Sequence, residues 1–139
     1  MVVGVGESPS GTAALAWARD LCEREQWHLE VVTGWPDSGQ AHVHEAPGHF
    51  SLARYRAVDA LNAALVAARI EIDAPWVAIH VENSDPVEAL VEHSRGARLL
   101  VVGASDSGRS RRAGQAPVSD RCRDRAACPV VVVDVEKAA

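Results

Sequence analysis

Apolar and polar positions follow two kinds of pattern along the chain. Short apolar runs occupy Val2–Gly6, His28–Gly34, Trp76–Val81, Ala97–Gly103 and Cys128–Val135. Between them, apolar residues recur every three or four positions in Ala13–Glu25, Ser51–Ile72, Asp85–Gly96 and Val118–Arg125. The runs predict buried strands and the other segments predict amphipathic helices. Because strands and helices alternate throughout, we expect an α/β protein with a parallel sheet and crossover helices.

Local signals mark the helix that begins near Asp85. Asp85 suits the N-cap, Pro86 suits the first helical position, and Glu88 is placed to reach back to the Asp85 N–H. Gly96 can adopt the left-handed conformation that ends a helix. The run that follows, "ARLLVVG", is apolar almost throughout. It therefore predicts a strand that is covered on both faces, at the centre of the sheet.

Composition and charge exclude several classes of protein. With 139 residues and 47% hydrophobic content, residues 1–139 are expected to form a single domain. A formal net charge of −5 argues against a nucleic-acid partner. The chain has no apolar stretch of about 18 residues and no basic leader, so we expect no membrane partner and a cytoplasmic location. One lysine among many arginines suggests a bacterial, GC-rich genome.

Cysteine and tryptophan residues are expected to serve the core. The three cysteines, Cys22, Cys122 and Cys128, form no C-x-x-C pair, so they predict reduced, buried thiols, with redox sensing as a minor alternative. The tryptophans are expected to pack helices onto the sheet, although Trp35 could instead stack a ligand; the set is Trp17, Trp27, Trp35 and Trp76.

Several strings, taken in order, resemble the universal stress protein family. They are "VVGV" with "SPSGTAALAWA", "SDPVEALVE", "ARLLVVGAS" and "CPVVVVDV". The resemblance implies a three-layer α/β/α fold: an open, doubly wound sheet of five parallel strands in the order 3-2-1-4-5, with four helices, two on each face. It also implies a homodimer that pairs through the last strand. Val130 to Val135 would form an apolar edge, which is prone to pairing.

The loop "VVGASDSGRSRRAGQAPVS" corresponds to the phosphate-binding loop of nucleotide-binding relatives. Their motif has a Gly at the end of the fourth strand, a second Gly three positions on, and a Gly followed by Ser or Thr after nine more residues. Here Gly103 matches the first Gly, whereas Asp106 and Ala116-Pro117 replace the rest. At about 5 Å and an effective dielectric near 20, each like-charge pair between Asp106 and phosphate costs roughly 3 kcal/mol. Pro117 also lacks an N–H donor.

The other half of the expected pocket is altered as well. Where nucleotide-binding relatives have an Asp at the end of the first strand, this chain has Gly6, followed by Glu7. Arg109, Arg111 and Arg112 could hold an anion instead, because Arg recognises phosphate through paired donors. The candidate nucleotide or anion pocket therefore comprises Gly6, Glu7, Gly103, Asp106, Gly108, Arg109 and Ser119.

Other chemistry receives little support from the sequence. His42, His44 and His49 carry metal-binding groups, but their spacing matches no established zinc site, so we expect no metal site. Ser105, Ser107 and Ser110 lack a G-x-S-x-G elbow and an ordered base, so no catalytic residue is expected.

We expect a non-catalytic stress-response or regulatory protein, homodimeric, which requires no cofactor and binds ATP weakly or not at all. The alternative is an ATP- or AMP-binding switch. A hydrolase or transferase is a third, weaker hypothesis, and a further protein partner stays unidentified.

Overall fold

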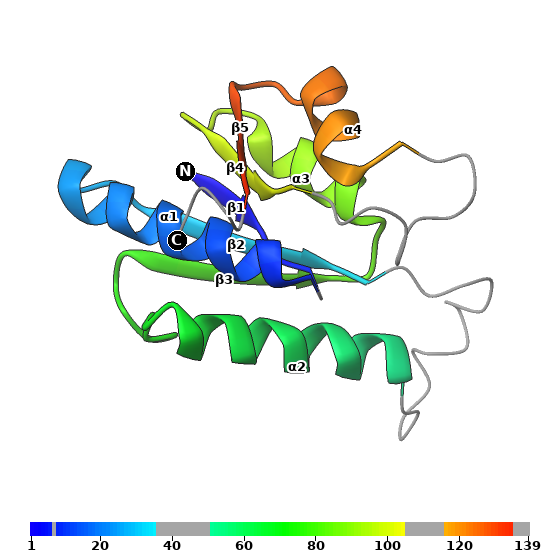
Figure 1. Ribbon diagram of the computed structural model, residues 1–139, viewed down its shortest axis with the longest axis horizontal. Coiled ribbons are helices and arrows are strands. Elements are labelled where there is room, and N and C mark those ends of the chain that lie inside the picture. Colours follow the sequence, from blue (N-terminus) through cyan, green and yellow to red (C-terminus); the bar gives the residue numbers. More distant parts are fainter. Residues whose placement is uncertain (7, 36–50, 105–115, 135–139) are drawn as a thin grey trace.

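A computed structural model describes residues 1–6, 8–35, 51–104 and 116–134. Strands and helices alternate along the chain (Figure 1). The strands are β1 (Val2–Gly4), β2 (Leu29–Gly34), β3 (Val77–Glu82), β4 (Leu100–Gly103) and β5 (Val130–Val133). The helices are α1 (Pro9–Glu25), α2 (Leu52–Ala67), α3 (Pro86–Ser94) and α4 (Val118–Arg125). The expected α/β architecture is confirmed.

The strands form one sheet in the order β3-β2-β1-β4-β5, and every pairing is parallel. At the middle of the sheet, Val3 pairs with Val31 on one side and with Val101 on the other. This order confirms the five-stranded, doubly wound sheet. The buried β4 is an interior strand, as its apolar run predicts, but β1 and not β4 is the central one.

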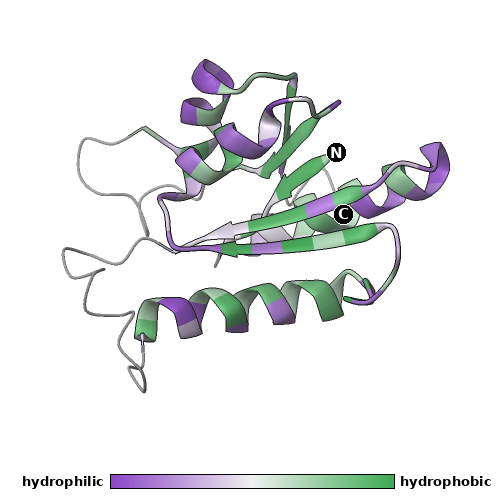
Figure 2. Ribbon diagram, turned by 180° about the vertical axis from the view of Figure 1, so that it is seen from behind, coloured by the Kyte–Doolittle hydropathy of each residue, from purple (hydrophilic) through white to green (hydrophobic). Residues whose placement is uncertain are grey.

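Two apolar cores lie on opposite faces of the sheet. Helices α1 and α2 cover one face, where Leu15 and Leu65 pack with Val3, Val31 and Val101. Helices α3 and α4 cover the other face. There Leu90 and Cys122 belong to one core with Val2 and Leu100, strand residues whose side chains point to this face. Figure 2 shows mostly apolar strands between helices in which apolar and polar residues alternate. The three-layer α/β/α arrangement follows from the period-two alternation of the strands.

Several element boundaries differ from the sequence prediction. Strand β1 ends at Gly4, not Gly6. Helix α1 begins at Pro9, four residues before the predicted start, because Ser8 caps it and Pro9 suits the first turn. Helix α2 ends at Ala67, not Ile72, and Arg69 beyond it has a positive φ of 58°. The apolar periodicity therefore extended past the point where the backbone turns.

Helix α3 confirms most of its predicted start and stop. The Asp85 carboxylate accepts hydrogen bonds from the N–H groups of Val87 and Glu88. The predicted return contact from Glu88 to the Asp85 N–H is wrong, since the Glu88 carboxylate binds Arg125 at 2.7 Å. Gly96 has φ +78°, the left-handed conformation expected after the helix.

Cysteine and tryptophan placements largely agree with expectation. Cys22 and Cys122 are buried, Cys128 is half-buried, and all three are free thiols. Three tryptophans, Trp17, Trp27 and Trp76, pack against the core under α1 and α2. Among the described residues, the longest apolar helices fall short of what is needed to cross a bilayer.

Candidate functional site

The candidate site lies at the carboxyl end of the sheet, beyond the ends of β1 and β4. The strand order reverses there, because β2 and β3 lie on one side of β1 whereas β4 and β5 lie on the other. In open α/β sheets, ligands bind at such a switch point. Gly6, after β1, and Gly103, which ends β4, both belong to this region.

Serines of the first turn of α1 occupy the region beside β1. The Ser8 hydroxyl accepts a hydrogen bond from the Ser10 N–H at 3.2 Å, and the Ser8 carbonyl accepts one from the Gly11 N–H at 3.0 Å. The two serine hydroxyls lie 2.8 Å apart. Two donors that a helix N-terminus would offer to an anion are therefore already engaged within the chain.

Close approach between β4 and α1 explains the glycine at position 103. A Cβ added to Gly103 would lie 2.5 Å from the carbonyl carbon and oxygen of Ser10, which is itself buried. Only a residue without a side chain lets α1 begin this near the end of β4. In this structure, Gly103 therefore serves helix packing, whether or not an anion also approaches it.

Gly6 is in the opposite situation. It is exposed, and a Cβ added there would meet no described atom within 4 Å. The strand end before it is firmly held, because the Val5 N–H donates to Val32 and the Val5 carbonyl accepts from the buried Thr33 hydroxyl at 2.7 Å. No described atom therefore occupies the place of a side chain at position 6, and glycine offers no carboxylate where the family resemblance leads us to expect an Asp.

The start of α4 is the second helix N-terminus near this edge (Figure 1). Pro117 is its N-cap and makes no side-chain capping hydrogen bond, while Asp120 lies in the first turn. Ser119 is buried at 7% exposure. An acidic side chain already complements the positive end of the helix dipole, and it repels a second anion there.

Two of the three arginines of α4 contact the start of α3, whereas the third, Arg123, is exposed. Arg121 lies 3.6 Å from the Asp85 carboxylate, and Arg125 lies 2.7 Å from that of Glu88. The Arg125 hydrogen bond and charge lower the pKa of Glu88, and the same pair raises the pKa of Arg125. These two cations therefore link helices and are not free to neutralise a phosphate at the sheet edge.

The structure brings both Gly6 and Gly103 against the first turn of α1, beside Gly11 and Ser10 respectively. Four other candidate residues lie outside the described residues, namely Glu7, Asp106, Gly108 and Arg109. So do the loop groups His42, His44, His49, Arg111 and Arg112. Sequence reasoning missed the roles of Ser8 and Ser10; the string "SPSG", a cap residue followed by Pro, was the available signal.

Comparison with known proteins agrees with this architecture. The model of the family described as "Universal stress protein family" matches residues 1–134. The structure is similar to the universal stress protein UspA from Lactobacillus plantarum, with 20% identity, a TM-score of 0.68 and 95% of each chain covered. It is also similar to a universal stress protein from Archaeoglobus fulgidus in complex with dAMP, with 18% identity, a TM-score of 0.67, and 95% and 94% covered.

A third solved structure is a universal stress protein in complex with cAMP. It shares 26% identity with this chain at a TM-score of 0.64, over 95% of this chain and 93% of its own. The family match extends over nearly the whole sequence, and the strand order and layers agree with it. The chain belongs to the universal stress protein family.

Proposed function

We propose that this protein is a non-catalytic regulatory member of its family that binds ATP weakly or not at all. The observation that carries the proposal is the state of the N-termini of α1 and α4, which follow β1 and β4 at the point where the strand order reverses. At the start of α1, two backbone N–H groups already donate to Ser8. At the start of α4, Pro117 has no N–H to donate and Asp120 places a negative charge in the first turn. A triphosphate needs free backbone donors and compensating positive charge at this place.

Charge near the site supports the same conclusion. Of the three arginines of α4, Arg121 and Arg125 are paired with Asp85 and Glu88 on the α3 side, and Arg123 is exposed. The whole chain carries a formal charge of −5, so the general field also opposes a polyanion. Gly6 supplies no carboxylate to hold a nucleoside.

A non-catalytic role is supported by the polar groups at the edge. Among the described residues there, Ser8 and Ser10 contact each other and backbone groups. A serine nucleophile needs a base within hydrogen-bond reach, and the contact that the Ser10 hydroxyl makes is with another hydroxyl. We therefore assign Ser8 to capping of α1 and Ser10 to its first turn.

We further propose that the protein is a homodimer that pairs through β5. This strand lies at one edge of the sheet, and its first three valines are only half-buried. An apolar edge with unpaired backbone groups favours pairing with a second copy. Analytical ultracentrifugation should give twice the chain mass. Val130→Lys should shift the mass toward the monomer, whereas Val66→Lys, at a residue 78% exposed on α2, should leave the dimer intact.

A ligand panel tests the nucleotide part of the proposal. Protein purified without added nucleotide is denatured, and the released small molecules are quantified by chromatography. Thermal melting is then recorded with millimolar ATP, AMP and cAMP. We expect no stoichiometric nucleotide and no ATP-dependent rise in melting temperature. A ligand present at about 100 times its Kd would stabilise the fold by about 2.7 kcal/mol, so tight ATP binding would be visible as a rise. Bound ATP in the purified protein would overturn the proposal.

The second candidate function is a switch that binds a nucleoside monophosphate. It is favoured by one observation, the structural likeness at 26% identity to a family member in complex with cAMP. A monophosphate brings fewer negative charges to the start of α4 than ATP does. A melting temperature that rises with AMP or cAMP, but not with ATP, would support this second candidate over the first.

A further inference from the structure

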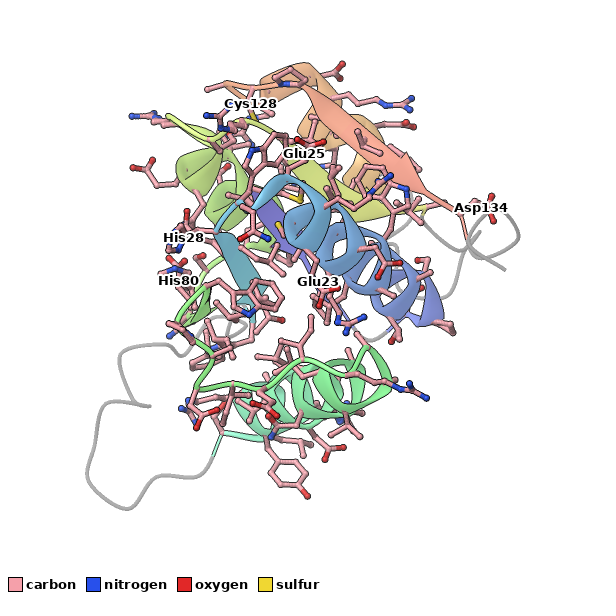
Figure 3. The ribbon with its side chains drawn as sticks, turned by 90° about the vertical axis from the view of Figure 1, so that its left-hand side faces the viewer. Glu23, Glu25, His28, His80, Cys128 and Asp134 are labelled. Carbon is pink, nitrogen blue, oxygen red and sulfur yellow. The ribbon has the colours of Figure 1, made fainter. Side chains whose placement is uncertain are left out.

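Away from the sheet edge described above, two histidines and two glutamates converge on the α3 side of the sheet. Glu30 lies on β2, and His80 and Glu82 lie on the edge strand β3. The register pairs Glu30 with Ala78 and Val32 with His80, so these alternate positions face the same side. His93 comes from the last turn of α3, which covers that face. Figure 3 shows His80 on the side of the strands away from α1.

Three of these side chains direct ligand atoms toward one point. His80 Nε2 lies 3.1 Å from Glu30 Oε1, and His93 Nδ1 lies 3.7 Å from the same oxygen. One ligand atom from each residue lies within 4.8 Å of the others. Ligand atoms of a tetrahedral ion with bonds of about 2.0–2.1 Å are about 3.3 Å apart. The cluster therefore already has nearly the dimensions of a metal site.

Hydrogen bonds account for two contacts of the cluster, His80 Nε2 with Glu30 and His93 Nε2 with Glu82, but not for the approach of His93 Nδ1 to Glu30. A single carboxylate oxygen of Glu30 faces ring nitrogens of two different histidines, whose ring centroids are 4.5 Å apart. A carboxylate oxygen can accept hydrogen bonds from two N–H groups, but His93 Nδ1 lies beyond hydrogen-bond distance at 3.7 Å, so its approach to Glu30 is not a hydrogen bond. A divalent cation can accept lone pairs from both imidazoles and from the carboxylate at the same time.

Glu82 provides the outer contact that metal-binding histidines usually have. Its carboxylate pairs with Nε2 of His93, on the side of the ring opposite the converging Nδ1. If Nε2 carries the proton and donates it to Glu82, the lone pair of Nδ1 is left for a metal ion. Glu82 is thus a positioning residue, which fixes the tautomer and the orientation of the His93 ring.

Solvent reaches the cluster, although its histidine rings are mostly buried. The His93 side chain is 20% exposed and that of His80 is 34% exposed, so both rings are held by neighbours while solvent reaches them. Water can supply a fourth ligand from the open side. No metal site was expected, because the spacing of His42, His44 and His49 matches no established zinc site. Glu30, His80 and His93 were not considered, since they lie far apart in the sequence and only the fold brings them together.

We propose that Glu30, His80 and His93 bind one divalent transition-metal ion, with Zn²⁺ as the ion best suited to the donor set. Two imidazoles favour such ions over Mg²⁺ and Ca²⁺, which prefer all-oxygen sites. The bound ion joins β2, the edge strand β3 and α3. This site shares no residue with the sheet-edge pocket, so metal binding here can be tested independently of the proposed function.

Zinc titration against a chromophoric chelator tests the proposal on the full chain. We expect one Zn²⁺ per chain and a higher melting temperature with Zn²⁺ but not with Mg²⁺. Glu82→Gln should weaken Zn²⁺ binding by roughly 10- to 100-fold, as expected for an outer contact. His80→Gln and His93→Gln should weaken it at least as much. The matched control, His42→Gln with His44→Gln and His49→Gln, should bind Zn²⁺ like the unmodified chain.

Two further measurements separate loss of the site from loss of the fold, and histidine ligation from cysteine ligation. Circular dichroism and melting of the metal-free variants report whether each still folds. Co²⁺ spectra should show d–d bands of a nitrogen and oxygen site and lack the intense thiolate charge-transfer band of a cysteine site. The proposal is overturned if the unmodified chain binds no Zn²⁺, if the loop-histidine control loses binding while folded His80→Gln and His93→Gln retain it, or if the thiolate band appears.

Discussion

Gly103 ends β4 directly against the backbone of Ser10, so that a Cβ at position 103 would lie 2.5 Å from the Ser10 carbonyl. This contact sets the distance between the end of β4 and the first turn of α1. At Gly6, which lies against Gly11 of the same turn, an added Cβ would meet none of the described atoms within 4 Å. Two glycines of one candidate pocket therefore differ sharply in what they contribute to stability.

Substitution of these two glycines by alanine should separate the roles. Gly103→Ala must push α1 away from β4 because the nearest atoms are backbone, and we expect a loss of about 1–3 kcal/mol in the free energy of unfolding. Gly6→Ala should change that free energy by less than about 0.5 kcal/mol. Urea denaturation of both variants checks the prediction. Equal stabilities would show that the close approach at Gly103 is relieved without cost.

Ser94 links α3 to the segment before β5. Its fully buried hydroxyl donates to the Val91 carbonyl at 2.6 Å and accepts from the Ala127 N–H at 2.9 Å. Ser94→Ala leaves the Ala127 N–H without its acceptor, so we expect a loss of about 1–3 kcal/mol in unfolding free energy. Amide hydrogen exchange should report faster exchange at Ala127 in the variant. Unchanged exchange there would contradict the assigned contact.

Cys122 should behave as an unreactive core thiol whose ionisation lowers the stability of the fold at alkaline pH. Burial raises its pKa from 9.0 to about 11, against the lowering effect of Arg121. Since the unfolded thiol loses its proton first, the stability from this group is complete below about pH 9 and is lost as pH rises toward about 11.

Urea denaturation at about pH 8 and pH 10.5 measures this effect. The unmodified chain should lose more stability between these two conditions than Cys122→Ala does, because only the unmodified chain has the Cys122 thiol. The pKa values of Cys22 and Cys128 are also raised, but both thiols remain in both proteins, so their contribution cancels in the comparison. An identical loss in the two proteins would mean that Cys122 is not protected by burial. Iodoacetamide should also modify Cys122 slowly in the folded chain.

The order of elements and the α3 boundaries could be predicted because their signals are local. Asp85 followed by Pro86 specifies a helix start through the next turn alone, and Gly96 specifies its stop. The end of α2 was misplaced because Ile70 is buried and continues the apolar period, although the N–H of Ile70 already turns back to the Leu65 carbonyl. Periodicity records which residues are buried, not where the backbone stops coiling.

The sites depend on contacts that sequence order does not reveal. Gly103 looked like part of a phosphate motif, yet its neighbour in space is Ser10, far earlier in the chain. Glu30 and His80 are 50 residues apart and meet only through the register of β2 and β3. The alternation of polar residues at 80 and 82 within an apolar strand was a usable signal that one face of β3 is not covered by core.

Restoring residues of the family's nucleotide-binding motif tests whether their replacement in this chain weakens ATP binding. No described atom lies within 4 Å of a Cβ added at Gly6, so we expect Gly6→Asp to be tolerated. Combined with Asp106→Gly and Pro117→Ser, it returns a nucleoside contact, removes a like charge and restores an N–H donor. Removal of one like-charge pair at about 3 kcal/mol alone corresponds to about a hundredfold in affinity. The combined variant should therefore bind ATP more tightly than the unmodified chain.

Isothermal titration calorimetry of ATP into the unmodified protein tests the central claim most directly, with the Gly6→Asp, Asp106→Gly, Pro117→Ser variant measured beside it. We predict no saturable heat below millimolar ATP for the unmodified chain and measurable binding for the variant. A micromolar Kd for ATP in the unmodified protein would contradict the claim that its sheet-edge pocket is unsuited to a triphosphate.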